Sequence, residues 1–135
     1  MASIRREIRI DAPVADVWPL IGDPGRIHHW FPGIVDCTVQ ENEDGTVRNV
    51  TLGSGISLEE HVVTNDPIAH RFQYRIAGGV FRQHLGTVDV IGLDDSTSLA
   101  VYSTDALPDV MALVIGGASG VALENIKSLA EEATR

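Results

Sequence analysis

Three residues able to bind or transfer protons, a carboxylate, a phenol and an imidazole, fall on the apolar sides of neighbouring predicted strands. Side chains alternate between the two faces of a strand, so residues two apart share a face. By this parity Glu60 lies with Leu58 and Val62, Tyr74 with Phe72 and Ile76, and His84 with Val88 and Val90. If these faces line one cavity, the three groups can hold a polyphenol or a carbonyl compound. They can also act as acid and base in an aldol cyclisation or dehydration. Glu60, Tyr74 and His84 are therefore the candidate ligand-binding and catalytic residues, and desolvation is expected to favour the protonated, acidic form of the carboxyl group.

Each of these residues also has a purely structural interpretation. Glu60 can be an inward polar residue paired with an arginine, Tyr74 a wall residue, and His84 a solvated residue near the end of its strand. Asp105 is a further candidate ligand contact, because it ends the last predicted strand at the parity of Leu99 and Val101. The parity argument therefore identifies inward residues, and it leaves open which of them meet a ligand.

The longest uninterrupted element in the sequence is a predicted helix of about seven turns over residues 108–134. Pro108 and Asp109 suit its start, and no proline follows them. Residues at three- and four-residue steps share one face: Met111, Val114, Ala118, Ala122, Ile126, Leu129 and Ala133. The second half of the helix also has a polar face, whereas the first half has none. We therefore expect the first half to be covered nearly all round.

Three glycines, Gly116, Gly117 and Gly120, lie in the middle of this helix, where each costs ~1 kcal/mol relative to alanine. They indicate either the close approach of a sheet or a space kept free for a ligand, which these glycines would then contact. Their spacing also matches that of membrane helix pairs. A membrane span is disfavoured because the apolar run, bracketed by Asp109 and Glu124, is shorter than the ~18 residues that a span needs.

The rest of the chain has the pattern of one strand, two short helices and a six-strand meander. Residues 4–10 alternate as a half-buried strand, and two proline-containing helix starts follow it. Pro19 is expected to kink or end the first of these helices near Trp18. Six segments with period-two alternation follow, and the short turns between them force antiparallel pairing of neighbours. These predicted strands cover residues 35–40, 47–52, 56–64, 70–76, 81–91 and 98–104. A single α+β domain over residues 1–135, with one sheet wrapped around the long helix, buries all the apolar faces.

Composition narrows the classes of function. The 135 residues carry a net charge of −9 and are 44% hydrophobic, which favours a globular chain and argues against nucleic-acid binding. Cys37 is the only cysteine, so no internal disulfide can form, and the N-terminus has no apolar signal core. A cytoplasmic location is expected. No metal site and no cofactor are expected, because one cysteine and no histidine pair at zinc-site spacing are present and no phosphate-loop spacing occurs.

The succession of segments, rather than any single motif, resembles the START/Bet v-type superfamily (SRPBCC) and, within it, the bacterial polyketide cyclase/dehydrase-like branch. The segments that carry the resemblance are Ile8-Arg9-Ile10-Asp11-Ala12-Pro13, Val17-Trp18, Asp23, Trp30-Phe31-Pro32-Gly33, Glu60-His61-Val62, Asp66-Pro67, Tyr74-Arg75-Ile76 and the long C-terminal helix. The resemblance covers nearly the whole chain and implies a helix-grip fold. In that fold a curved antiparallel sheet of about seven strands, with two short helices after the first strand, grips the helix over a cavity for an apolar or aromatic molecule. The fold would place His29 and Trp30 on the short helix that borders the cavity entrance, where Trp30 is either a core residue or a further ligand contact and His29 a surface residue. Pro19 and His84 depart from the family pattern.

The superfamily includes lipid carriers, hormone receptors and cyclases, so the fold alone does not determine function. The sequence favours the binding of a small hydrophobic or aromatic molecule in an internal cavity. One alternative is a cofactor-independent polyketide cyclase or dehydratase. Another is a protein-interaction module with a vestigial cavity, for example a homodimer formed through an edge strand or an exposed apolar surface.

Overall fold

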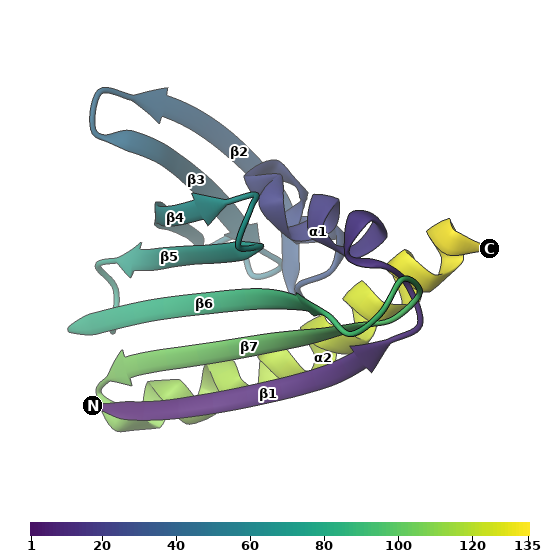
Figure 1. The fold of residues 1–135 in the computed structure, drawn as a ribbon. Coiled ribbons are helices and arrows are strands. Elements are labelled where there is room, and N and C mark those ends of the chain that lie inside the picture. Colours follow the sequence, from purple (N-terminus) through teal and green to yellow (C-terminus); the bar gives the residue numbers. More distant parts are fainter.

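The computed structural model describes all 135 residues as one curved seven-stranded antiparallel sheet that grips a long C-terminal helix (Figure 1). Its elements in chain order are β1 (Ala2–Ile10), α1 (Val14–Gly22), the 3₁₀ helix η1 (Pro24–His29), β2 (Ile34–Asn42), β3 (Gly45–Leu52), β4 (Ser57–Asp66), β5 (Arg71–Ala77), β6 (Gln83–Gly92), β7 (Ser98–Leu107) and α2 (Asp109–Thr134). The strands lie in the order β1-β7-β6-β5-β4-β3-β2, so each strand of the meander pairs with the next and β1 pairs with β7. The predicted helix-grip α+β fold is therefore confirmed.

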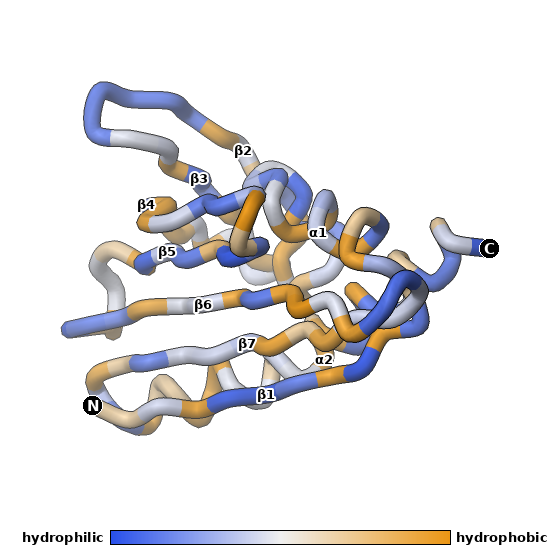
Figure 2. The backbone as a smooth tube through the Cα atoms, in the orientation of Figure 1, coloured by the Kyte–Doolittle hydropathy of each residue, from blue (hydrophilic) through white to orange (hydrophobic).

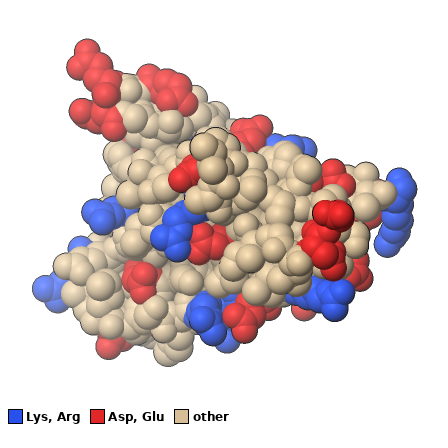
Figure 3. Space-filling view, viewed as in Figure 1, with Lys and Arg blue, Asp and Glu red and all other residues tan.

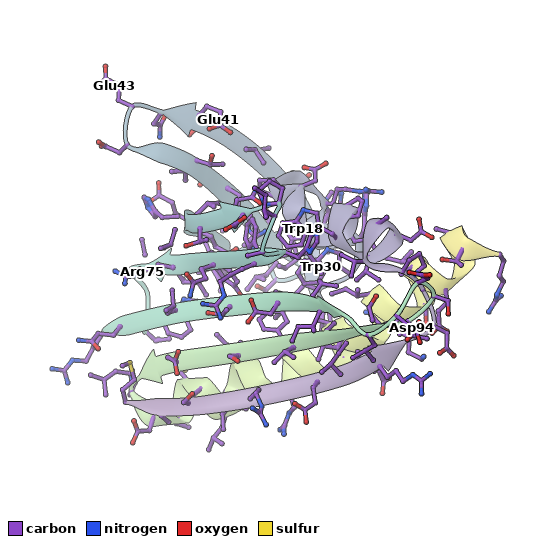
Figure 4. All side chains as sticks on the ribbon, in the orientation of Figure 1. Trp18, Trp30, Glu41, Glu43, Arg75 and Asp94 are labelled. Carbon is purple, nitrogen blue, oxygen red and sulfur yellow. The ribbon has the colours of Figure 1, made fainter.

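The β2–β3 hairpin extends beyond the rest of the sheet (Figure 1). Asn42 pairs with Gly45 across a two-residue loop, and the φ of +122° at Gly45 is a conformation that glycine adopts without strain. The tip of the hairpin is hydrophilic (Figure 2), and acidic side chains gather there, including Glu41 and Glu43 (Figures 3 and 4). The tip of the hairpin therefore adds little to the apolar core.

The core is most completely filled where α1 and the second half of α2 meet β6 and β7. Val17, Ile21 and Ile126 are buried there with at most 1% of their surface exposed. Helix α1 continues through Pro19 to Gly22, so the alternative in which it ends near Trp18 is wrong, and a kink at that point stays a prediction. Proline removes one backbone hydrogen bond at that point, and the burial of the residues that follow it stabilises the last turn.

Helix α2 runs along β1 and β7, and its buried residues are Ala112, Gly116, Ser119, Ala122, Leu123, Ile126 and Ala130. In its first half the buried face differs from the predicted one, since Val114 is 60% exposed while the small residues face the sheet. The reason is the close approach of β1, because a Cβ atom on Gly116 would lie 2.6 Å from Cγ2 of Ile4.

The expectation that the first half of α2 would be covered nearly all round is wrong. Val110, Leu113, Val114 and Val121 are 48–63% exposed and form an uncharged outer face. By length and composition alone, α2 is apolar enough to cross a membrane, although 39% of its most apolar window is buried inside the protein. The core helix of a globular domain passes the same test, so this property is weak evidence for a membrane span.

Candidate functional site

An apolar pocket of about 150 Å³ lies between the sheet, the η1 region and the first turns of α2. Its lining residues are Ile27, Phe31 and Ile34 from η1 and the segment after it, Val50, Leu52, Leu58, Glu60, Tyr74 and Ile76 from β3 to β5, Phe81 before β6, and Met111 and Ile115 from α2. Glu60 is the only charged residue among these twelve. The pocket therefore offers an apolar volume with one anionic group in its wall.

Glu60 is held in this wall by a buried ion pair with Arg48. The two residues are direct partners in the β3–β4 ladder, and Arg48 Nε donates a hydrogen bond of 2.6 Å to Glu60 Oε1. Their side chains are 1% and 5% exposed, respectively. A lone carboxylate would be costly at this depth, and the guanidinium compensates its charge. The alternative interpretation of Glu60, an inward polar residue paired with an arginine, is therefore confirmed.

Arg48 is fixed in turn by the aromatic residues around it. Its guanidinium carbon lies 5.0 Å from the ring centroid of Phe72 and 4.8 Å from that of Tyr74, which is cation–π geometry. Nη1 donates to the carbonyl oxygen of Pro24 over 3.4 Å. Burial acts to lower the pKa of Arg48, but the Glu60 carboxylate together with Tyr74 and Tyr102 raises the pKa overall. Arg48 therefore stays charged and keeps Glu60 oriented.

Tyr74 reaches from the pocket wall to Tyr102 on β7, and the two hydroxyl groups share a short hydrogen bond. Both side chains are fully buried, and burial raises the pKa of each phenol, that of Tyr74 well above its ordinary value. Gly86 on β6 makes room for this arrangement, because a Cβ atom there would lie 2.5 Å from the Tyr74 ring. The phenols therefore stay protonated at neutral pH, and in the hydrogen bond between them one hydroxyl donates and the other accepts.

His84 is 6% exposed and lies on the predicted inward face, but it does not line the apolar pocket. The β5–β6 ladder stops at the Tyr74–Gly86 pair, and beyond it the Ile76 amide donates to His84 Nδ1 over 3.0 Å. Burial lowers the pKa of His84 to about 4, so the ring is neutral at pH 7. Because Nδ1 accepts, the proton is on Nε2, which has no hydrogen-bond partner.

A second, wider hollow of about 660 Å³ opens beyond His84, at the ends of β5 and β6. It is lined by His61, Arg75, Arg82, His84 and Asp105, among other residues. Ile76 and Phe81 line both this outer hollow and the apolar pocket. These two side chains therefore separate the pocket from the solvent-facing hollow.

The other residues predicted to contact a ligand lie outside the apolar pocket. Trp30 is 2% exposed in the core (Figure 4), where Nε1 donates to the Leu20 carbonyl oxygen over 2.8 Å. On β7 the core-facing residues include Ala100, Tyr102 and Ala106, so Asp105 lies on the opposite face.

The three helix glycines also lie away from the pocket. Gly116 packs on Ile4, whereas Gly117 and Gly120 line an outer groove between α2 and β1. Contact of Trp30, Asp105 and these glycines with a ligand stays a prediction that the pocket geometry does not support. His29 is exposed, as expected.

Sequence reasoning missed two members of the buried polar cluster, Arg48 and Tyr102. A signal for Arg48 was present, because it shares the parity of Val50 and Leu52 in β3. Tyr102 shares the parity of Ala100 and Ala106, a face whose small residues gave it no clear apolar character. The structure brings these two residues together with Glu60 and Tyr74 at the inner wall of the pocket.

The fold and this apolar pocket define a helix-grip protein with one buried carboxylate at its cavity. The chain belongs to the family described as polyketide cyclase / dehydrase and lipid transport, whose model matches residues 1–131. No curated protein matches the sequence.

Solved structures give the same fold. The chain resembles XoxI from Bacillus cereus, at 22% identity and a TM-score of 0.85, over 100% of this chain and 99% of that one. It also resembles the Zhui aromatase/cyclase from Streptomyces sp. R1128, at 17% identity and a TM-score of 0.84, over 99% and 96% of the two chains. Norcoclaurine synthase from Thalictrum flavum is 18% identical with a TM-score of 0.76, over 99% and 96% of the two chains. The predicted polyketide cyclase/dehydrase-like branch of the SRPBCC superfamily is therefore confirmed.

Proposed function

We propose that this protein binds a small hydrophobic molecule, of about the size of one ring and with one hydrogen-bond donor, in the apolar pocket beside Glu60. The observation that carries the proposal is a pocket of about 150 Å³ whose wall is hydrophobic except for one oriented carboxylate. An apolar cavity of roughly this volume accommodates benzene. The family description, which includes lipid transport, supports a hydrophobic ligand.

The position of Glu60 favours a ligand with a hydroxyl or amine group. Arg48 Nε, which donates to Oε1, is the only hydrogen-bond partner of this carboxylate within the protein. The second carboxylate oxygen is therefore free to accept a hydrogen bond from a ligand. A hydrogen bond to a charged group contributes about 1.5–3 kcal/mol, which corresponds to roughly a tenfold or larger gain in affinity.

Separate titrations with phenol and with toluene test this proposal. Binding is measured by calorimetry and by the NMR signals of methyl groups in the pocket. We expect saturable binding of both probes, with phenol bound at least about tenfold more tightly. The double variant Arg48→Met with Glu60→Leu removes the whole ion pair and leaves no unpaired buried charge. It should bind toluene as the native protein does and lose the preference for phenol.

A pair of tryptophan variants on β4 controls for the location of binding. Leu58 lines the pocket, whereas Val63 is 50% exposed on the other face of the same strand. Leu58→Trp should fill the pocket and abolish binding, and Val63→Trp should leave it unchanged. Absence of saturable binding in the native protein, or equal binding by both tryptophan variants, would contradict the proposal.

A cofactor-independent cyclase or dehydratase is the second candidate, because a carboxylate and a phenol share one pocket. Glu60 would accept a proton from a carbon next to a carbonyl group, and the protonated Tyr74 would donate a hydrogen bond to the carbonyl oxygen. The names of the aromatase/cyclase and the synthase above support this candidate. The pocket volume restricts the reacting part of a substrate to about one ring. If Glu60→Gln and Tyr74→Phe leave turnover of a substrate unchanged, this candidate is excluded.

We propose that the protein is located in the cytoplasm and that its binding partner is a small molecule. Cys37 is a free thiol, and burial raises its pKa, which keeps it protonated and of low reactivity. Fractionation of the native host, followed by detection of the protein in each fraction, tests this location.

A further inference from the structure

The two edges of the sheet differ in how well they are protected against pairing with another strand. The β2 edge contains a register shift between Ile34 and Asp36 and ends at the acidic hairpin tip. The β1 edge pairs with β7 over nine residues without any shift, and no strand covers its other side, where Lys127 of α2 donates to the Arg9 carbonyl oxygen near the end of the strand. An unbulged edge strand is a ready template for a second chain.

The charges along β1 are self-complementary in two antiparallel registers, with the twofold axis at Arg6 or at Ile8. In a twofold arrangement, opposite residues of the two β1 strands must point to the same face of the joined sheet. Because side chains alternate between the faces, the numbers of two opposite residues must both be even or both be odd. With the twofold axis at Arg6, Arg5 lies opposite Glu7 of the second copy, and Ile4 lies opposite Ile8. Moving the axis to Glu7 would place Arg5 opposite Arg9 and Glu7 opposite itself. Opposite-charge pairs stabilise neighbouring strands and like charges destabilise them, so the charges disfavour the axis at Glu7. An axis at Ile8 would place Glu7 opposite Arg9, so the exposed face of α2 has to select between Arg6 and Ile8.

The axis at Arg6 passes close to the centre of the exposed face of α2. Arg6 Nε donates to the Gly116 carbonyl oxygen over 3.3 Å, which brings the middle of β1 next to Gly116 and Gly117. Leu113 and Val121, which are 63% and 48% exposed, lie four residues on either side of Gly117. No atom lies within 4 Å of a Cβ built on Gly117. An antiparallel crossing of two copies at Gly117 therefore places each Leu113 beside Val121 of the other copy.

The spacing of such a pair fits helix packing. Neighbouring strands lie about 4.8 Å apart. Because α2 packs over both β1 and β7, its axis lies about half a strand spacing inward from the edge strand β1. Two copies joined at β1 would then hold their α2 axes about 10 Å apart, which is within the usual range of 8–10 Å for packed helices. The like-charged Arg6 pair at the axis opposes the contact, and Glu124, which lines the same groove, is placed to offset it.

We propose that this protein forms a twofold homodimer in which the β1 edges pair antiparallel about Arg6 and the exposed faces of the two α2 helices cross at Gly117. The dimer extends the sheet across both copies and covers Leu113 and Val121 on the exposed face of α2. It does not depend on what the apolar pocket binds, because none of the residues in the contact lines that pocket.

Light scattering after size-exclusion chromatography of the full chain, at micromolar to submillimolar concentration, tests the dimer. The measured mass should be twice the 14.5 kDa of one chain. The Leu113→Glu and Val121→Glu variants should each be monomers. Val39→Glu, on the exposed side of the β2 edge, is the matched control and should leave the dimer intact. A monomeric native protein over the whole range, or a dimer unaffected by Leu113→Glu and Val121→Glu, would overturn the proposal.

Charge reversal and cross-linking test the register. Arg5→Glu should weaken the dimer at least several-fold, and the double variant Arg5→Glu with Glu7→Arg should restore it, because the swap recreates both pairs. In a Cys37→Ser background, Gly117→Cys should form a disulfide-linked dimer under mild oxidation, whereas Ile68→Cys, at a site 90% exposed, should not. Failure of the double variant to restore the dimer, or equal cross-linking at both sites, would contradict this register.

Binding of the native protein to neutral phosphatidylcholine vesicles, lost in Val121→Glu, would identify a membrane surface as the occupant instead.

Discussion

The two ends of the interior differ in how completely side chains fill the space between the sheet and the helices. Where α1 and the second half of α2 cover the sheet, residues such as Val17 and Ile126 are fully buried and fill the space. Where η1 and the first half of α2 cover it, Leu58 and Ile115 remain partly exposed around a pocket of about 150 Å³. The only buried ion pair in the protein stands at this second end. The comparison indicates that one end provides stability, whereas the other keeps a space with one oriented charge.

The largest expected effect comes from separating the ion pair at the pocket end. Arg48→Met would leave the Glu60 carboxylate buried without its partner, which costs about 3–5 kcal/mol of the free energy of unfolding. The double variant with Glu60→Leu should recover most of that loss, because no charge is left unpaired. Urea denaturation of both variants measures the difference, and equal destabilisation by both would contradict a compensating pair.

The packing of the two ends can be compared directly by truncating one isoleucine in each. Ile126→Ala at the filled end should cost about 2–5 kcal/mol, because the surrounding side chains cannot collapse into the cavity. Ile115→Ala borders an existing pocket, so it should cost less, roughly 1–2 kcal/mol. Thermal unfolding of the two variants measures this difference, and equal losses would remove the distinction between a filled and an open end.

His84 makes the stability of the pocket end depend on pH. Its pKa is about 4 in the folded protein and near 6.5 in the unfolded chain, so the unfolded chain binds the proton more tightly. The contribution is fully present above about pH 6.5 and is lost as the pH falls towards 4, by roughly 2–3 kcal/mol. Denaturation of His84→Gln at several pH values should show a flatter profile in this window. His61→Gln, at a half-exposed site, is the control and should behave as the native protein does.

A smaller effect is expected from closing the space behind Tyr74. A methyl group on Gly86 would lie 2.5 Å from the Tyr74 ring, so Gly86→Ala should push the phenol away from Tyr102 at a cost of about 1–3 kcal/mol. Gly53→Ala is the control, because its nearest contact would be an ordinary 3.9 Å. Ultraviolet difference spectra of the buried tyrosines, together with denaturation, should separate the two variants. A Gly86→Ala protein as stable as Gly53→Ala would show that the ring is free to move.

The order and type of the elements could be predicted from the sequence because period-two and period-three-to-four patterns are long and unambiguous in this chain. The inward position of Glu60, Tyr74 and His84 followed from strand parity. The rotation of α2 could not be predicted, because its first half is apolar on every side and the close contact of Gly116 with Ile4 is visible only in the fold. The Arg48–Glu60 pair depends on the β3–β4 register, which places the two residues opposite each other and which hydrophobic patterns do not specify.

The crystal structure of phenol-soaked crystals tests binding beside Glu60 most directly. We expect a single phenol in the apolar pocket, with its hydroxyl group within hydrogen-bond distance of Glu60 and its ring between Phe81 and the residues of α2. A crystal in which the pocket is collapsed, or in which phenol at saturating concentration binds only elsewhere, would contradict binding at this site.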